Sequence, residues 1–248
     1  MKEKMTIAQL RSTIFLQQNF GYTPETAKEF GDLLLPGAKV YGIAQPGVPM
    51  LGVNPTMPQY GLSWRLFKKQ DDGCEYNIAF QPGKIDIVLT KETPYGDETE
   101  LKFCKQSAEW FRQILAKRDK LFVQRIAYAP LYAIKINGDT DASSLWNGLL
   151  KKTVIDGIQA QDINLQFLLK RIVTFGGEEI QMNLLYQIFD GTQTKAKDDQ
   201  VIVDSVFLIQ LDLNSVPEKI LSLDSDGVDA FYNEILSLKN NLIDNVCA

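Results

Sequence analysis

The order of the hydrophobic patterns, in which alternating runs precede a helical stripe, constrains the fold of this chain most. Apolar and polar residues alternate over 62–66, 74–80 and 85–89, and the turn signals Asp72-Gly73 and Pro82-Gly83 separate these runs. Alternation with a period of two predicts strands that bury one face. Short turns between such strands predict an antiparallel meander with one buried and one wetter face.

A helix is predicted directly after this meander, and the same order returns in the second half of the chain. Apolar residues recur every three or four positions over 97–117 and 227–246, which is the spacing of an amphipathic helix. Further alternating runs lie at 122–136, with a break near Pro130, and at 163–175, 180–188 and 201–213. We therefore predict an α+β fold in two halves, 1–141 and 142–248, each an antiparallel meander of three to four strands followed by a covering helix. The halves are either separate or parts of one continuous domain.

The first forty residues are predicted to form a helical N-terminus. Ile7, Leu10 and Ile14 recur at helical spacing, and Thr23-Pro24-Glu25 has the cap, the proline and the acid of a helix start. The segment 41–61 that follows is predicted to be a Pro-rich loop, because each proline removes a donor from a strand ladder.

Composition excludes several classes of chemistry. The chain of 248 residues has no histidine, so Ser-His-Asp catalysis, Cys-His catalysis and His-based metal sites are excluded. Three widely spaced cysteines fit neither a disulfide framework nor a zinc site, and they favour a reducing, cytoplasmic location. No nucleotide-binding or nucleophile motif is present, so no cofactor or metal is expected and a non-catalytic role is favoured over an enzyme.

The charge and hydropathy patterns bear on possible partners. The net charge of −5 with only short basic clusters argues against broad nucleic-acid binding. No continuous apolar stretch predicts a signal peptide or a membrane span. A protein partner is expected, and the oligomeric state is left open.

Two places are candidate binding sites. Strict alternation puts Arg171 on the apolar face of its strand, where it would bind an anionic ligand or a partner's acid, form an internal ion pair, or turn to solvent at a bulge. The loop 41–61 carries Met50, Leu51 and Val53, which would be unusual on a plain surface connection. These apolar residues either pack on the protein's own sheet or contact a partner.

The stretch from 76 to 137 resembles a sporadically distributed family of uncharacterised prokaryotic proteins. The resemblance rests on Ala108-Glu109-Trp110-Phe111, Arg125-Ile126-Ala127-Tyr128 and Ile134-Lys135-Ile136-Asn137, together with the Phe231-Tyr232-Asn233-Glu234-Ile235 segment near the C-terminus. It implies no established activity and no catalytic residue, and the patchy distribution of the family implies a link to defence or mobile-element loci. The order of strands and helix is also similar to that of the export chaperone SecB, at the level of the fold only.

Three functions from different classes remain open on these grounds. The preferred hypothesis is a non-catalytic, protein-binding module, because a well-formed core pattern is present without any catalytic signature. The alternatives are a chaperone-like binder of extended polypeptides and an enzyme that uses carboxylates with a divalent metal ion. An exposed apolar patch would favour binding, and clustered acids in a deep pocket would favour the enzyme.

Overall fold

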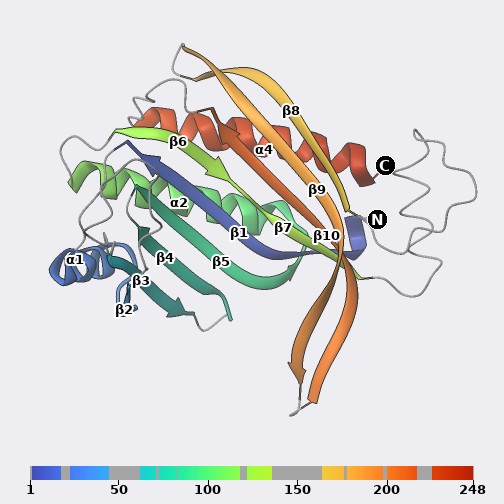
Figure 1. Cartoon of the computed structure of the whole chain (residues 1–248), viewed down its shortest axis with the longest axis horizontal. Helices are drawn as coiled ribbons and strands as arrows, with labels where there is room; N and C mark the ends of the chain where they lie inside the picture. Colours follow the sequence, from blue (N-terminus) through green and yellow to red (C-terminus); the bar gives the residue numbers. More distant parts are fainter. Residues whose placement is uncertain are drawn as a thin grey trace, which may run out of the picture.

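One antiparallel sheet of ten strands, with three α-helices on one of its faces, makes up the described part of the chain (Figure 1). The computed structural model describes residues 2–17, 23–44, 62–70, 73–81, 83–117, 122–135, 164–175, 178–197, 200–216 and 225–247. The helices are α1 (Pro24–Leu34), α2 (Asp97–Lys117) and α4 (Ser225–Cys247). The strands are β1 (Met5–Leu16), β2 (Lys39–Ala44), β3 (Leu62–Lys69), β4 (Glu75–Gln81), β5 (Lys84–Pro94), β6 (Val123–Tyr128), β7 (Leu131–Lys135), β8 (Asn164–Phe175), β9 (Glu178–Lys197) and β10 (Gln200–Ser215).

The two predicted meanders join into a single sheet. Its strand order is β2-β3-β4-β5-β1-β6-β10-β9-β8, and β7 pairs with both β1 and β10. The first meander, β3 to β5, is therefore linked to the second, β8 to β10, through β1, β6 and β7. The α+β class and the antiparallel sheet are confirmed, but the two halves do not each carry a separate helix-covered sheet. Helices α2 and α4 instead contact each other on the same face.

The prediction of a helix over the first apolar residues is wrong, because this segment is the central strand β1. Its register shifts between Ile7 and Gln9, which marks a β-bulge. A bulge adds one residue to a strand, so Ile7 and Leu10, three positions apart, are both buried. The same spacing on a helix would also give one apolar face, and the two structures cannot be distinguished over so few residues.

The predicted helix start at Thr23 is confirmed. The Thr23 hydroxyl accepts a hydrogen bond from the backbone N–H of Thr26 at 3.2 Å, and α1 begins at Pro24. The predicted loop 41–61 is partly wrong, because 41–44 belongs to the edge strand β2. The remainder of that loop lies outside the described residues.

The core lies between the sheet and the helices. Phe111 of α2 and Phe231 of α4 are fully buried, as the predicted helical stripes require. Phe30 of α1 stacks on Phe80 of β4 with ring centroids 5.2 Å apart, which fixes α1 over the β2–β4 end of the sheet. The opposite face of the sheet, called the open face below, is covered by none of the three described helices (Figure 1).

Candidate functional site

A buried ion pair joins α2 to α4 above the sheet. The Lys239 Nζ donates to the Glu100 Oε2 at 2.6 Å, and the two side chains are 1% and 0% exposed. The other carboxylate oxygen of Glu100 accepts hydrogen bonds from the hydroxyls of Tyr128 at 2.8 Å and Tyr132 at 2.5 Å. The Lys239 Nζ also donates to the Tyr95 hydroxyl at 3.2 Å. These five residues, called the buried cluster below, connect two helices with β6 and β7.

The buried cluster raises the pKa values of Lys239, Tyr128 and Tyr132, which keeps this lysine charged and these two phenols neutral. Burial on its own lowers the pKa of Lys239, but the carboxylate of Glu100 outweighs this, so the pKa is raised. Burial, and then the negative charge of Glu100, raise the pKa of Tyr128 and Tyr132 well above the ordinary phenol value. The same two causes raise the pKa of the nearby thiol of Cys104, which makes it a poor nucleophile.

The buried cluster is a structural feature of the protein rather than a reaction centre. Both oxygens of Glu100 accept hydrogen bonds from protein groups, and neither Glu100 nor Lys239 has surface that a substrate could contact. A buried pair of this kind costs desolvation energy and offsets it only when all of its polar groups are bonded. Its effect is therefore to hold α2 and α4 in one orientation on the sheet.

The sequence held a signal for the buried cluster that the analysis of apolar spacing missed. Leu101 fits the apolar spacing over 97–117 but is 39% exposed, whereas Glu100 is buried. Glu100 lies three and four positions before the buried Phe103 and Cys104, and Lys239 lies four positions after the buried Ile235. An acid on one buried stripe and a base on another indicate a buried pair between two helices.

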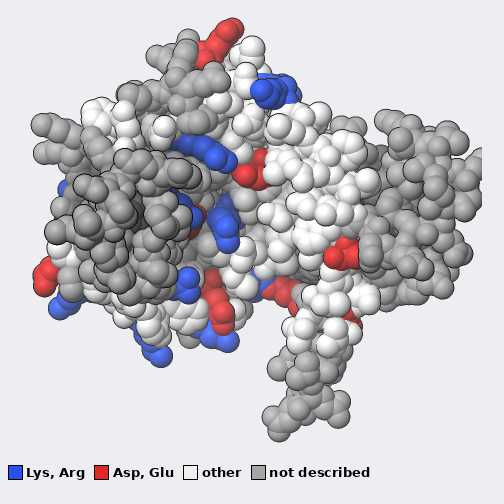
Figure 2. All heavy atoms as spheres, viewed as in Figure 1, with Lys and Arg blue, Asp and Glu red and all other residues white. Residues whose placement is uncertain are grey.

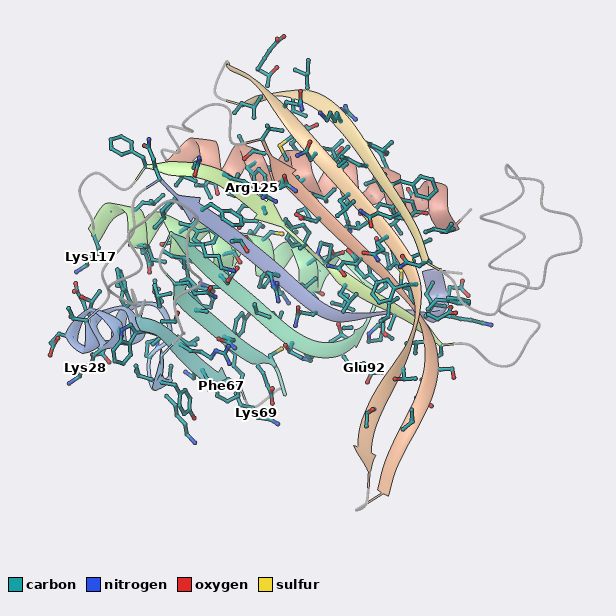
Figure 3. The ribbon with its side chains drawn as sticks, in the orientation of Figure 1. Lys28, Phe67, Lys69, Glu92, Lys117 and Arg125 are labelled. Carbon is teal, nitrogen blue, oxygen red and sulfur yellow. The ribbon has the colours of Figure 1, made fainter. Side chains whose placement is uncertain are left out.

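The open face carries a second polar network at the β5-β1-β6 centre of the sheet. Asp86 accepts hydrogen bonds from Thr13 at 2.6 Å and Gln81 at 3.2 Å, and its carboxylate lies 3.0 Å from the Lys84 Nζ. Arg125 lies on β6 (Figure 3). Its guanidinium lies over the Phe15 ring, and one guanidinium nitrogen is 3.6 Å from Asp212. Asp86, Lys84, Arg125 and Asp212 on this part of the open face thus have partners within the protein.

The β8 end of the open face differs from the centre, because charged side chains are sparse over β8, β9 and β10 (Figure 2). Among the described residues, strand β8 is the last strand of the sheet and has β9 as its one neighbour. Its residues are exposed on both faces: Phe167 and Leu169 on the helix side, each 46%, and Leu168 and Ile172 on the open face, 58% and 64%. A long apolar edge strand is a template for pairing with another strand, and most proteins block such edges.

Arg171 lies on this edge strand and is exposed. It shares the helix-side face with Leu169 and Val173, as strict alternation predicts, because the β8–β9 register has no bulge. On that face Val173 is buried, but Leu169 and Phe167 are about half exposed. The alternation of apolar residues therefore did not show that the face is buried. Met50, Leu51 and Val53, the other predicted binding residues, lie outside the described residues.

A metal site and a membrane-spanning helix are both absent from the described residues. No group of three or more Cys, Asp or Glu side chains is placed to hold a metal ion in these ranges. None of the described helices is both long and apolar enough to cross a membrane.

Comparison with known proteins adds no family assignment. No protein-family model matches the chain, and no curated protein matches its sequence. The resemblance carried by the 108–111, 125–128 and 134–137 segments therefore remains an expectation.

Proposed function

We propose that this protein is a non-catalytic binding module that captures an extended polypeptide strand along the free edge of β8. The observation that carries the proposal is the exposure of apolar side chains on both faces of this twelve-residue edge strand. A strand added beside β8 would cover Phe167 and Leu169 on one face and Leu168 and Ile172 on the other.

The backbone of β8 supports this mode of binding. In an antiparallel sheet, alternate residues of an edge strand direct their N–H and C=O groups away from the neighbouring strand. Those groups supply the main-chain hydrogen bonds of strand addition, and pockets for alternate side chains supply its selectivity. Among residues 164–175 only Lys170 and Arg171 are charged, so β8 contributes two positive charges and no negative one.

The chaperone-like alternative shares the edge but differs in selectivity. A chaperone for extended chains needs a broad apolar surface, whereas β8 offers one strand with a fixed register and two fixed cations. This combination favours a defined partner over unfolded chains in general. The alternative of a carboxylate and metal enzyme finds no acidic cluster to support it among the described residues.

Selection of strand-forming peptides tests the proposal. A library of twelve-residue peptides displayed on phage would be selected against the full chain, and the affinity of the selected peptides measured by fluorescence anisotropy. We expect selected peptides to alternate apolar and polar residues and to protect the amides of 164–175 from hydrogen exchange.

A pair of edge variants provides the control. Leu168→Glu with Ile172→Glu should weaken peptide binding by about tenfold or more, because two buried contacts of the added strand are lost. Val40→Glu with Tyr41→Glu changes exposed residues on the opposite edge strand, β2, and should leave the affinity unchanged. Peptides that bind both variants as well as the parent would show that β8 is not the binding site.

A further inference from the structure

The two edges of the sheet differ in length and accessibility, which limits how copies of the chain can associate. Strand β2 has six residues and lies beside α1, whereas β8 has twelve, lies beside α4 and carries exposed apolar side chains on both of its faces. Pairing β8 of one copy with β2 of the next would leave a β8 edge at one end, so that further copies add without closing the assembly. Pairing β8 with β8 about a two-fold axis consumes both long edges and closes the assembly.

We infer that the strand captured at β8 is the β8 strand of a second copy of this chain, paired antiparallel about a two-fold axis at Leu169. This inference rests on the proposed function and names its partner. The pairing joins two ten-stranded sheets into one continuous sheet, with the helices of both copies on the same side.

The alternation of β8 restricts the register. Leu165, Phe167, Leu169, Arg171 and Val173 share the helix-side face, because their β9 partners are the buried residues of that face. In a continuous sheet, directly opposite residues must point to the same face. A two-fold axis perpendicular to the sheet must therefore lie midway between one residue and the same residue of the second copy, and this residue is named below as the position of the axis.

Charge and length then select Leu169 among the central residues. An axis at Lys170 would place two lysines directly opposite each other, which is destabilising. An axis at Leu168 would pair only 164–172, whereas an axis at Leu169 pairs 164–174. At Leu169, Arg171 lies opposite the second copy's Phe167, where a cation–π contact is possible, and Lys170 lies opposite the second copy's Leu168.

The apolar surface available is of the size that such a contact needs. Phe167, Leu168, Leu169 and Ile172 are 46%, 58%, 46% and 64% exposed. Four large side chains exposed to this degree present roughly 300–400 Å² per copy, divided between the two faces of the strand. Two copies, with the backbone of the added ladder and its polar rim, approach the lower limit of about 1,200 Å² for a specific interface.

Cysteine scanning of three adjacent positions tests the axis directly. Leu168→Cys, Leu169→Cys and Lys170→Cys would each be made with Cys247→Ser, since the remaining cysteines, Cys74 and Cys104, are buried. Only a residue on the axis has its own copy about 4.5–5.5 Å away, within disulfide range, while its neighbours lie about 7–8 Å from theirs. We expect Leu169→Cys to give roughly tenfold more disulfide-linked dimer under mild oxidation than either neighbour.

Light scattering after size exclusion measures the association itself. The parent chain should have the mass of a dimer at tens of micromolar, and Leu169→Lys, which places two lysines at the axis, should be a monomer. Thr90→Lys, an exposed position on β5 away from the edge, adds the same charge and should remain a dimer.

The outcomes separate this inference from the proposed function. A monomeric parent chain that still binds selected peptides along 164–175 would overturn self-pairing and leave strand capture intact. A dimer that crosslinks best at 168 or 170, or that persists in Leu169→Lys, would overturn the axis at Leu169. A monomer that binds no peptide at β8 would overturn both.

Discussion

The buried cluster and the β8 edge depart from the usual distribution of residues in opposite directions. At the buried cluster, Glu100 and Lys239 hold charges inside the protein, while at β8 Leu168 and Ile172 expose apolar side chains outside it. The charges inside have protein partners at hydrogen-bond distance, whereas the apolar residues outside are left accessible. A buried polar group whose hydrogen bonds are all made within the protein indicates a role in stability. An apolar strand exposed to solvent indicates a binding surface.

Breaking the ion pair should have the largest effect on stability. Lys239→Met removes the cation and leaves the carboxylate of Glu100 buried without its positive partner. We expect the free energy of unfolding to fall by about 3–5 kcal/mol, measured by urea denaturation at pH 7. A loss below about 1 kcal/mol would show that water reaches Glu100 and that the cluster is less buried than the geometry indicates.

Truncating the core aromatics should have a comparable effect and calibrates the first experiment. Phe111 and Phe231 are both fully buried, one on each helix beside the cluster. Phe111→Ala or Phe231→Ala should each cost about 3–5 kcal/mol, because a large side chain is replaced by a cavity. Unchanged denaturation midpoints in both variants would contradict the placement of α2 and α4 on the sheet.

Alkaline pH should weaken the protein through the raised pKa values of the cluster. The pKa of Lys239 is raised above 10.5, and those of Tyr128 and Tyr132 above 10.0. The folded state therefore keeps protons that the unfolded state has released above about pH 10. Stability should begin to fall above about pH 9, where the thiol of Cys104 ionises only in the unfolded state, and should fall more steeply above about pH 10, by about 1.4 kcal/mol per pH unit for each proton retained. Chemical denaturation at a series of pH values checks this, and stability that rises above pH 10 would contradict it.

Replacing both charges should have a smaller effect than removing one. Glu100→Gln combined with Lys239→Met keeps an acceptor for the tyrosine hydroxyls and leaves no buried charge. We expect the double variant to recover most of the loss seen in Lys239→Met, to within about 1–2 kcal/mol of the parent. A double-mutant cycle on unfolding free energies measures the recovery, and strictly additive losses would show that the pair is not coupled.

Polar substitutions on β8 should have the smallest effect on stability. Leu168→Ser and Ile172→Thr change side chains that are more than half exposed, so unfolding free energies should stay within about 0.5 kcal/mol. The same variants should reduce peptide binding or self-association. Large destabilisation would mean that these residues pack inside the isolated protein. It would contradict the statement that β8, unlike the buried cluster, contributes little to stability.

The sequence predicted local structure better than the place of each element in the fold. The alternation at Leu165, Phe167 and Leu169 identified β8, and helical spacing identified α2 and α4. No local pattern states that β8 is the last strand of the sheet, because strand order depends on contacts between distant segments. The exposure of β8 was therefore missed, although the adjacent charges of Lys170 and Arg171 pointed to solvent on both faces.

The sequence predicted only part of the β8 edge and of the buried cluster. Arg171 was predicted to be a binding residue, and it lies on the β8 edge. The reason given for that prediction was that its face would be buried, and this reason was wrong. The segments Glu100–Phe103 and Ile235–Lys239 contained the residues of the ion pair at helical positions that face the core. Their partnership could not be deduced, since two helices far apart in sequence become neighbours only once the sheet is complete.

The central position of β1 has a consequence for how the chain folds as it is made. Strand β1 is the first strand in sequence, but it pairs with β5 on one side and with β6 and β7 on the other. The separation between Thr13 and Asp86 is 73 residues, and between Ser12 and Ala127 it is 115. At roughly 5–20 residues per second, β1 waits on the order of 4–15 seconds for its first partner and longer for its second. The rate of synthesis therefore limits when the sheet can form. Its middle strand is made first but has paired strands on both sides only after the chain has passed residue 128.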